Sequence, residues 1–208
     1  MTETIQASKL NLMELKLKFG LELTEDENFF PEWQGDLPEL TDLEKQLMDD
    51  LKQEYRHLSQ YPMPEAVVKL VVLGPLLKWA GFYRPPFFIT GEKQVEITSQ
   101  DGETVVNGRL DLLVFIPDFW ILSIEAKKAQ YSLEAGIPQV LAYMLGSPGE
   151  EKPAYGMVNN GPEFIFLKLT RQGTPKYAES DLFSVRRNTD LYTVLQVLKR
   201  LGKLVIEE

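Results

Sequence analysis

Three charged residues interrupt two neighbouring apolar stretches of the chain. The stretches run over residues 109–116 and 121–127, on either side of a Pro-Asp turn, and they have the length and residue types of core β-strands. The interrupting residues are Asp111, Glu125 and Lys127. Burying an unpaired carboxylate or ammonium is costly, so each of the three must be paired, hydrogen bonded or bound to a metal. The simplest structure that satisfies all three is a cation-binding site on a β-hairpin.

The pairing of this hairpin decides whether the three side chains can meet. Residues two apart on a strand point to the same side, so Glu125 and Lys127 share a face. Asp111 joins them only if it lies directly opposite Glu125. A regular two-residue Pro-Asp turn would set Asp111 opposite Ile124 and turn its carboxylate to the other side. A shared site therefore predicts an irregular hairpin, with either a three-residue loop, Pro117-Asp118-Phe119, or a bulge.

The chemistry of these side chains indicates metal-dependent hydrolysis. Two convergent carboxylates suit a hard divalent ion, so Asp111 and Glu125 predict a Mg²⁺ or Mn²⁺ site. The ammonium of Lys127 would lower the pKa of a metal-bound water and offset the charge of a phosphoryl transition state. The chain has no cysteine and a single histidine, His57, so thiol nucleophiles and Cys-based zinc sites are excluded. The alternative interpretation is a structural ion-pair network on a solvated sheet face.

Composition limits where a nucleic acid could bind. The chain has 208 residues, of which 44% are hydrophobic, and 31 acidic against 22 basic residues give a net charge of −9. This balance is that of a globular protein without a basic surface overall, so any nucleic-acid contact must be local. Basic residues gather in the later half: Lys127, Lys128, Lys168, Arg171, Lys176, Arg186 and Arg187. The sequence shows no signal peptide and no apolar run long enough to cross a bilayer, so we expect a cytoplasmic protein.

The order of the expected elements predicts the fold class. Weak periodicity and scattered prolines indicate an appended N-terminal arm at 1–40 that is not part of the core, followed by one domain at 41–208. Helices are expected at 41–59, where Thr41 and Glu44 would form a capping box, at 64–80 with a kink at Gly74-Pro75, at 132–145 and at 190–201. Pro138 should either kink the third of these helices or mark its true first turn. Strands are expected at 87–90, 94–98, 104–116, 119–127, 155–159, 163–169 and within 177–185. This order predicts an α/β fold with a central mixed β-sheet flanked by helices.

The charged motif resembles a known group of enzymes. Asp111 followed by Glu125-Ala-Lys127 resembles the signature of the PD-(D/E)XK nuclease superfamily, which has the restriction-endonuclease-like fold. Two further features fit: Glu65 near the start of a helix before the sheet, and Gln139-Val-Leu-Ala-Tyr143 on the helix after it. The layout is similar to the N-terminal nuclease domain of type I restriction-enzyme subunits. It departs from that group in lacking a Gly-x-x-x-x-Gly-Lys-Ser/Thr loop, so no ATP-driven motor is expected within this chain.

The resemblance implies a metal-dependent DNA endonuclease that acts through activated water. Asp111 and Glu125 would hold the metal and Lys127 would assist the nucleophile. Residues implied in substrate contact are Arg109, Lys128, Gln139 and Tyr143.

Several of these residues also have plainer interpretations. Glu65 is either a third metal ligand or water-holder, or an ordinary first-turn acid favoured by the helix dipole. Arg109 contacts either phosphate or a neighbouring acid. Tyr143 either orients the substrate or is an interface aromatic with a hydrogen-bonded hydroxyl.

A second class of function is also open. The acidic surface and the unassigned arm favour a catalytically inactive nuclease-like module that binds DNA or a partner protein. The arm and the helix that begins near Thr41 could also form the interface of a homodimer.

Overall fold

A single mixed β-sheet organises the chain. A computed structural model describes residues 3–99, 102–127, 132–149 and 151–206, and Lys128, expected to contact substrate, lies outside this part. In the described part the sheet has nine strands in the order β1-β4-β5-β6-β7-β8-β2, with β3 paired to β4 and β9 to β7. The strands are β1 (Glu3–Gln6), β2 (Glu22–Leu23), β3 (Phe88–Thr98), β4 (Thr104–Ile116), β5 (Phe119–Ala126), β6 (Ala154–Asn159), β7 (Glu163–Thr170), β8 (Lys176–Glu179) and β9 (Phe183–Ser184).

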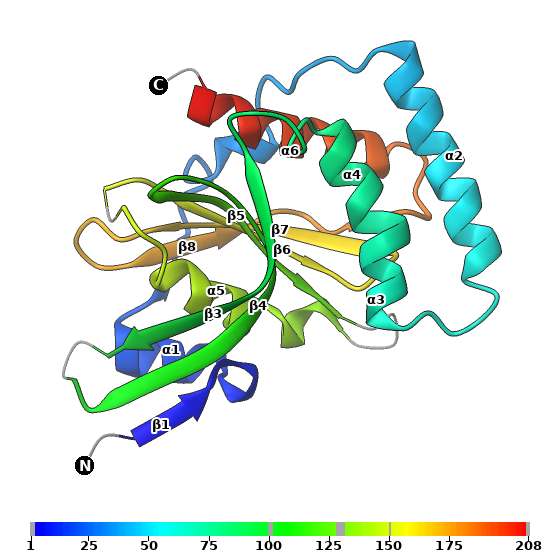
Figure 1. Ribbon diagram of the computed structural model, residues 1–208. Helices are drawn as coiled ribbons and strands as arrows, with labels where there is room; N and C mark the ends of the chain where they lie inside the picture. Colours follow the sequence, from blue (N-terminus) through cyan, green and yellow to red (C-terminus); the bar gives the residue numbers. More distant parts are fainter. Residues whose placement is uncertain (1–2, 100–101, 128–131, 150, 207–208) are drawn as a thin grey trace.

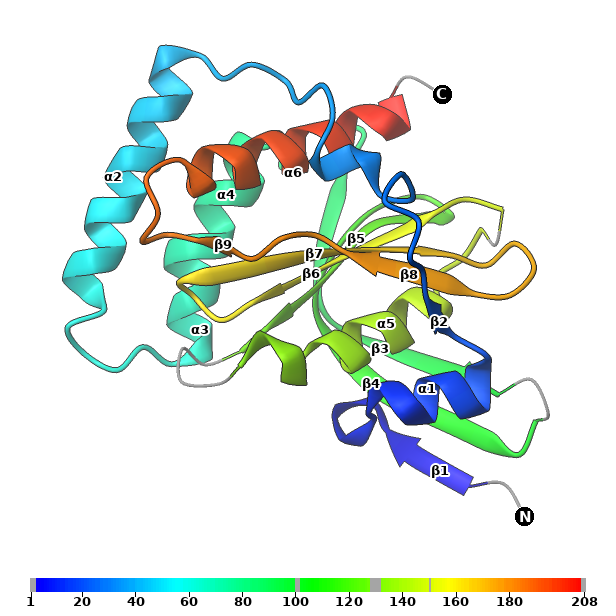
Figure 2. The same cartoon turned by 180° about the vertical axis from the view of Figure 1, so that it is seen from behind.

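Helices cover both faces of this sheet. They are α1 (Leu12–Phe19), α2 (Asp42–Leu58), α3 (Glu65–Val68), α4 (Gly74–Trp79), α5 (Ile137–Leu145) and α6 (Asp190–Ile206). Figures 1 and 2 show α2, α3, α4 and α6 on one side, and α1 and α5 on the other. This arrangement confirms the expected α/β fold with a central mixed sheet. No helix among the described residues is long and apolar enough to cross a membrane.

Strand alternation divides the hydrophobic core into two layers. On β6 and β7, the paired residues Met157 and Phe166 belong to the layer under α2, α4 and α6. Their neighbours Val158 and Leu167 belong to the layer under α1 and α5. All four are fully buried, and each fully buried apolar side chain contributes about 1.5–3 kcal/mol. Both faces of the central strands are therefore apolar, and a charged group there needs a specific partner.

The first forty residues take part in this core. Strand β1 pairs with β4 at one edge of the sheet, and β2 pairs with β8 at the other. Leu15, Phe19 and Leu21 are buried in the layer that contains α5. Glu32 accepts hydrogen bonds from Lys168 and from the Tyr155 hydroxyl, at 2.6 and 2.8 Å. The expectation that this segment lies outside the core is therefore wrong. Its strands are short and lie at the edges of the sheet, so the sequence shows little periodicity there. A domain boundary at residue 40 stays a prediction.

The helical segment before the sheet is continuous but irregular. Residues 65–79 form α3, a π-helical segment at Lys69–Leu73, and α4. The kink expected at Gly74-Pro75 appears instead as the π-helical turn that ends just before Pro75. Proline has no amide hydrogen and its ring crowds the preceding turn, and a wider turn relieves that conflict. This turn begins at Lys69.

Other expected elements agree in type and differ at their ends. Helix α2 begins with the predicted capping box between Thr41 and Glu44. The expected strands at 87–90 and 94–98 are one strand, β3, in which Glu92 has a φ of 55° and bends the chain without reversing it. Pro138 lies in the first turn of α5 and does not kink it, which is one of the two alternatives expected for this proline. Helix α6 continues to Ile206, beyond the expected end at 201.

Candidate active site

The β4–β5 hairpin has the irregular register that a shared site requires. Ile116 lies opposite Phe119 across a two-residue turn, in which Asp118 has a φ of 62°. The register then shifts by one residue between Phe115 and Val114, and from there Leu112 lies opposite Ile124. The paired residues end there, and Asp111 and Glu125 are the next residues along the two strands. The prediction of an irregular hairpin is confirmed. The irregularity is a β-bulge, in which an extra residue in one strand shifts the pairing by one residue.

Asp111 is fixed by two hydrogen bonds on different sides. Its Oδ2 accepts the backbone amide of Ala126 at 2.8 Å, which ties the carboxylate to the end of β5. Its Oδ1 accepts the ammonium of Lys69 at 2.7 Å. The side chain keeps 17% exposure, so the carboxylate lies at the border between the core and solvent.

Glu125 is the most deeply buried acid of the group. Its side chain is 5% exposed, and Oε1 accepts the ammonium of Lys127 at 2.7 Å. Its other oxygen, Oε2, is buried and has no hydrogen-bond partner among the described residues. Burial raises the pKa of Glu125 to about 7, with the negative charge of Asp111 adding to the effect and Lys127 opposing it. A buried carboxylate oxygen without a partner is unfavourable unless a proton or a ligand satisfies it.

Lys127 follows β5 and turns to the same side as Glu125. Its backbone amide donates to the carbonyl of Asn159 at 2.7 Å, which extends the pairing with β6. Its ammonium donates to Glu125 and, at 2.9 Å, to Oε1 of Gln139 on α5. The structure thus brings Asp111, Glu125 and Lys127 together at the end of the hairpin, facing α5.

Gln139 and Tyr143 share one face of α5, as their spacing predicts, but both are buried. Gln139 donates to the Tyr143 hydroxyl at 2.8 Å. That hydroxyl donates to the carbonyl of Arg109 and accepts its amide, at 3.0 and 3.1 Å. Burial raises the pKa of Tyr143 to about 12. The interface interpretation of Tyr143 matches this arrangement, and a contact of either side chain with substrate stays a prediction.

The close packing of Tyr143 requires a glycine on β4. A Cβ atom built at Gly108 would lie 2.6 Å from the Tyr143 ring and 2.8 Å from its hydroxyl oxygen. Such distances are shorter than van der Waals contact, so a larger residue would push α5 away from the sheet. Gly108 therefore sets how near α5, and with it Gln139, comes to the charged group.

Sequence reasoning missed Lys69. Its ammonium lies 2.7 Å from Oδ1 of Asp111 and 2.8 Å from Oε1 of Glu65. Partial burial acts to lower the pKa of Lys69, but the hydrogen bonds and charges of the two acids outweigh it and raise the pKa above its usual value. The i,i+4 spacing of Glu65 and Lys69 signals their mutual pair. The contact of Lys69 with Asp111, 42 residues further along the chain, has no signal in the sequence.

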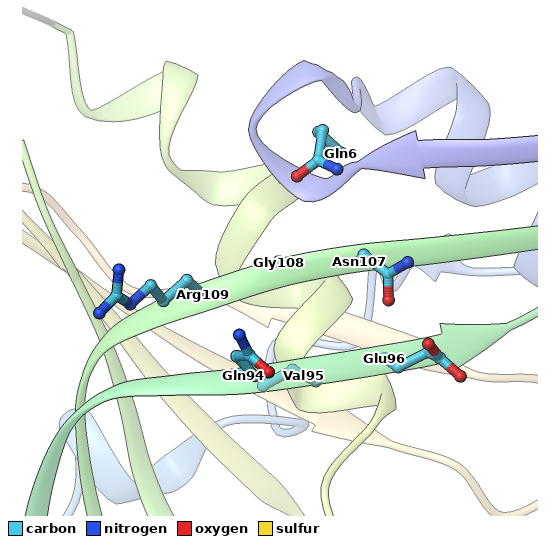
Figure 3. Close-up of a pocket in the computed structure, with 7 residues that line it drawn as sticks. All are labelled: Gln6, Gln94, Val95, Glu96, Asn107, Gly108 and Arg109. Carbon is cyan, nitrogen blue, oxygen red and sulfur yellow. The ribbon is translucent and has the colours of Figure 1, made fainter.

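Arg109 lies next to a polar pocket on strands β3 and β4. Its guanidinium forms an ion pair with Glu92, which matches the neighbouring-acid interpretation. The pocket has a volume of about 500 Å³. Figure 3 shows Arg109 at one end and the polar side chains along it. The lining residues are Gln6, Gln94, Val95, Glu96, Asn107, Gly108 and Arg109.

The donor set fits one divalent cation. Glu125 offers a buried oxygen without a partner, and the Asp111 carboxylate has lone pairs beyond its two hydrogen bonds. Mg²⁺ is commonly held by one or two carboxylates and keeps several waters. No group of three or more His, Cys, Asp or Glu that could hold a metal occurs among the described residues. Glu65 therefore does not complete a three-acid cluster with Asp111 and Glu125.

Comparison with solved structures gives several matches, among them a fragment of a restriction-enzyme subunit. No protein family and no curated protein matches the sequence. A solved structure from Vibrio vulnificus YJ016, described as a fragment of an HsdR subunit of a type I restriction enzyme, is 27% identical and aligns with a TM-score of 0.41. The likeness covers 68% of this chain and 26% of that chain, so the matched part spans about a quarter of the length of the solved chain. At such a TM-score, the resemblance to the PD-(D/E)XK superfamily stays an expectation.

Proposed function

We propose that this chain is a metal-dependent nuclease that hydrolyses phosphodiester bonds in DNA. The observation that carries the proposal is the meeting of Asp111, Glu125 and Lys127 on one side of a bulged hairpin, with a buried oxygen of Glu125 left without a partner. A site that receives a cation leaves it open.

Asp111 and Glu125 would hold Mg²⁺ or Mn²⁺. Such an ion, when bound, polarises a phosphoryl oxygen and acidifies water. Lys127, held by Glu125 and Gln139, would place its positive charge beside the phosphorus centre and offset the negative charge that develops there. Gln139 acts as the support that keeps the ammonium on this side. Glu65, which is paired with Lys69, would not bind the metal directly.

DNA is the substrate class that the resemblance implies. Because the net charge is −9, contact with the phosphate backbone must rest on a few local cations. Arg109 is 62% exposed at the side chain and is two residues from Asp111 on the same strand, which supports a role in phosphate contact. Lys128, next to Lys127, would take the same role.

One observation favours a second candidate function. The ammonium of Lys69 already neutralises part of the charge on Asp111 and Glu65. A site whose charge is satisfied internally has less need of a metal, which suits a module that binds DNA or a partner protein without cutting. A homodimer or a partner subunit stays a prediction for either candidate.

Plasmid nicking separates the two candidates. Supercoiled plasmid is incubated with the protein and Mg²⁺ or Mn²⁺, with a chelator as the blank. The wild type and the matched control Asp118→Asn, which alters an exposed acid in the turn of the same hairpin, are expected to nick the plasmid. Asp111→Asn and Lys127→Met should lose roughly a hundredfold or more of the rate. Equal nicking by all four proteins would reject the catalytic proposal, and DNA binding without nicking would favour the second candidate.

A further inference from the structure

Lys69 occupies a position that a cation could take. Its ammonium bridges carboxylates from two elements, Asp111 on β4 and Glu65 on α3, at 2.7 and 2.8 Å. Glu65 and Lys69 lie one turn apart, and Lys69 opens the π-helical segment. Turns of this kind are frequent at functional sites. The π-helical turn and the two short ion pairs thus both involve Lys69.

The charges of the group leave room for one divalent ion. Three carboxylates, those of Glu65, Asp111 and Glu125, face two ammonium groups, those of Lys69 and Lys127. The balance is one negative charge, which one divalent ion would turn into one positive charge. A second divalent ion would add two further positive charges in a partly buried site, which is unfavourable.

The unused donors belong to Glu125 and Asp111. Glu125 has an oxygen without a partner, and it feels the charge of Asp111 more strongly than that of Glu65. Glu65, at 37% side-chain exposure, is joined to Asp111 through Lys69. An ion between Asp111 and Glu125 would therefore leave the Lys69 bridge in place.

We propose that Lys69 takes the place of a second cation, so that the site admits a single divalent ion. Glu65 then holds Lys69 in position and is not a metal ligand. Lys69 acts as a positioning residue, because it orients Asp111 and limits the number of ions. This inference rests on the proposed function, since it assumes that Asp111 and Glu125 hold a metal.

Calorimetric titration of the full chain with Mn²⁺ tests the inference without any activity assay. The wild type should bind one Mn²⁺. Lys69→Met should bind the first ion about tenfold or more tightly, because a positive charge near the ion is removed, and should admit a second ion. The matched control Lys78→Met, which alters an exposed lysine on α4, should behave as the wild type. Glu65→Gln should keep one Mn²⁺ and lose less than about tenfold in affinity.

The outcomes distinguish this inference from the proposed function. Wild-type protein that binds no Mn²⁺, or binds it equally well after Asp111→Asn, would overturn both. Binding that depends on Asp111 but involves two ions in the wild type would overturn the inference alone, as would Lys69→Met binding that equals the wild type. A loss in Glu65→Gln as large as in Asp111→Asn would also overturn it, and this variant decides the question if Lys69→Met does not fold.

Discussion

Replacement of Glu125 by glutamine should stabilise the metal-free protein at neutral pH. The pKa of Glu125 is raised from 4.5 to about 7, chiefly by burial. Between these values the folded state holds a proton that the unfolded state has released. The free energy of unfolding therefore falls as pH rises from about 4.5 to about 7, and the loss is complete above that range. Glutamine, with the same shape and no charge, removes this loss.

The size of the effect follows from the pKa. A change from 4.5 to about 7 corresponds to about 3 kcal/mol, at about 1.36 kcal/mol for each pH unit. This is an upper value for Glu125→Gln, because Lys127 loses its charged partner in the variant. Urea denaturation with a chelator present, at pH 5 and pH 8, gives the free energy of unfolding of each protein. We expect the variant to gain up to about 3 kcal/mol over the wild type at pH 8 and much less at pH 5.

A matched control identifies the source of the effect. Glu96 is an exposed acid on β3, so Glu96→Gln should follow the wild-type pH dependence. If Glu125→Gln is less stable than the wild type at both pH values by the same amount, the charge of Glu125 is stabilised in the folded state and the reasoning from burial fails.

Three further changes test the support of the site. Tyr143→Phe removes the partner of the Arg109 backbone amide and should lower the free energy of unfolding by about 1–3 kcal/mol in urea denaturation; an unchanged value would contradict the role of this hydroxyl. Gly108→Ala places a methyl group 2.6 Å from Tyr143 and should cost about 1–3 kcal/mol, seen as a lower melting temperature. Arg109→Gln should weaken DNA binding, measured by fluorescence anisotropy, and should lower the slope of log affinity against log salt concentration by about one, with no change in melting temperature.

The hairpin shows how far sequence reasoning can go. Charged residues at fixed positions in two apolar strands require one particular register, and the bulge beyond Phe115 supplies it. Local signals were equally informative at Thr41 and Glu44, whose side chains form the capping box of α2. In both places the deciding interactions lie close together along the chain.

The unpredicted features depend on contacts between distant residues. Strands β1 and β2 are short and pair with segments about a hundred or more residues away, so their periodicity carries no signal. Lys69 meets Asp111 only because the helix before the sheet packs beside the middle of β4. The burial of Tyr143 depends on its fit over Gly108, which the spacing of Gln139 and Tyr143 cannot indicate.

A crystal structure of the protein soaked with Mn²⁺ tests the central claim most directly. The anomalous signal of manganese locates the ion without reference to any activity. We expect one peak within ligand distance of both the Asp111 and the Glu125 carboxylates, with Lys127 beside it and Lys69 still bridging Asp111 and Glu65. A map with no manganese between Asp111 and Glu125, at a concentration that saturates binding in solution, would contradict the account.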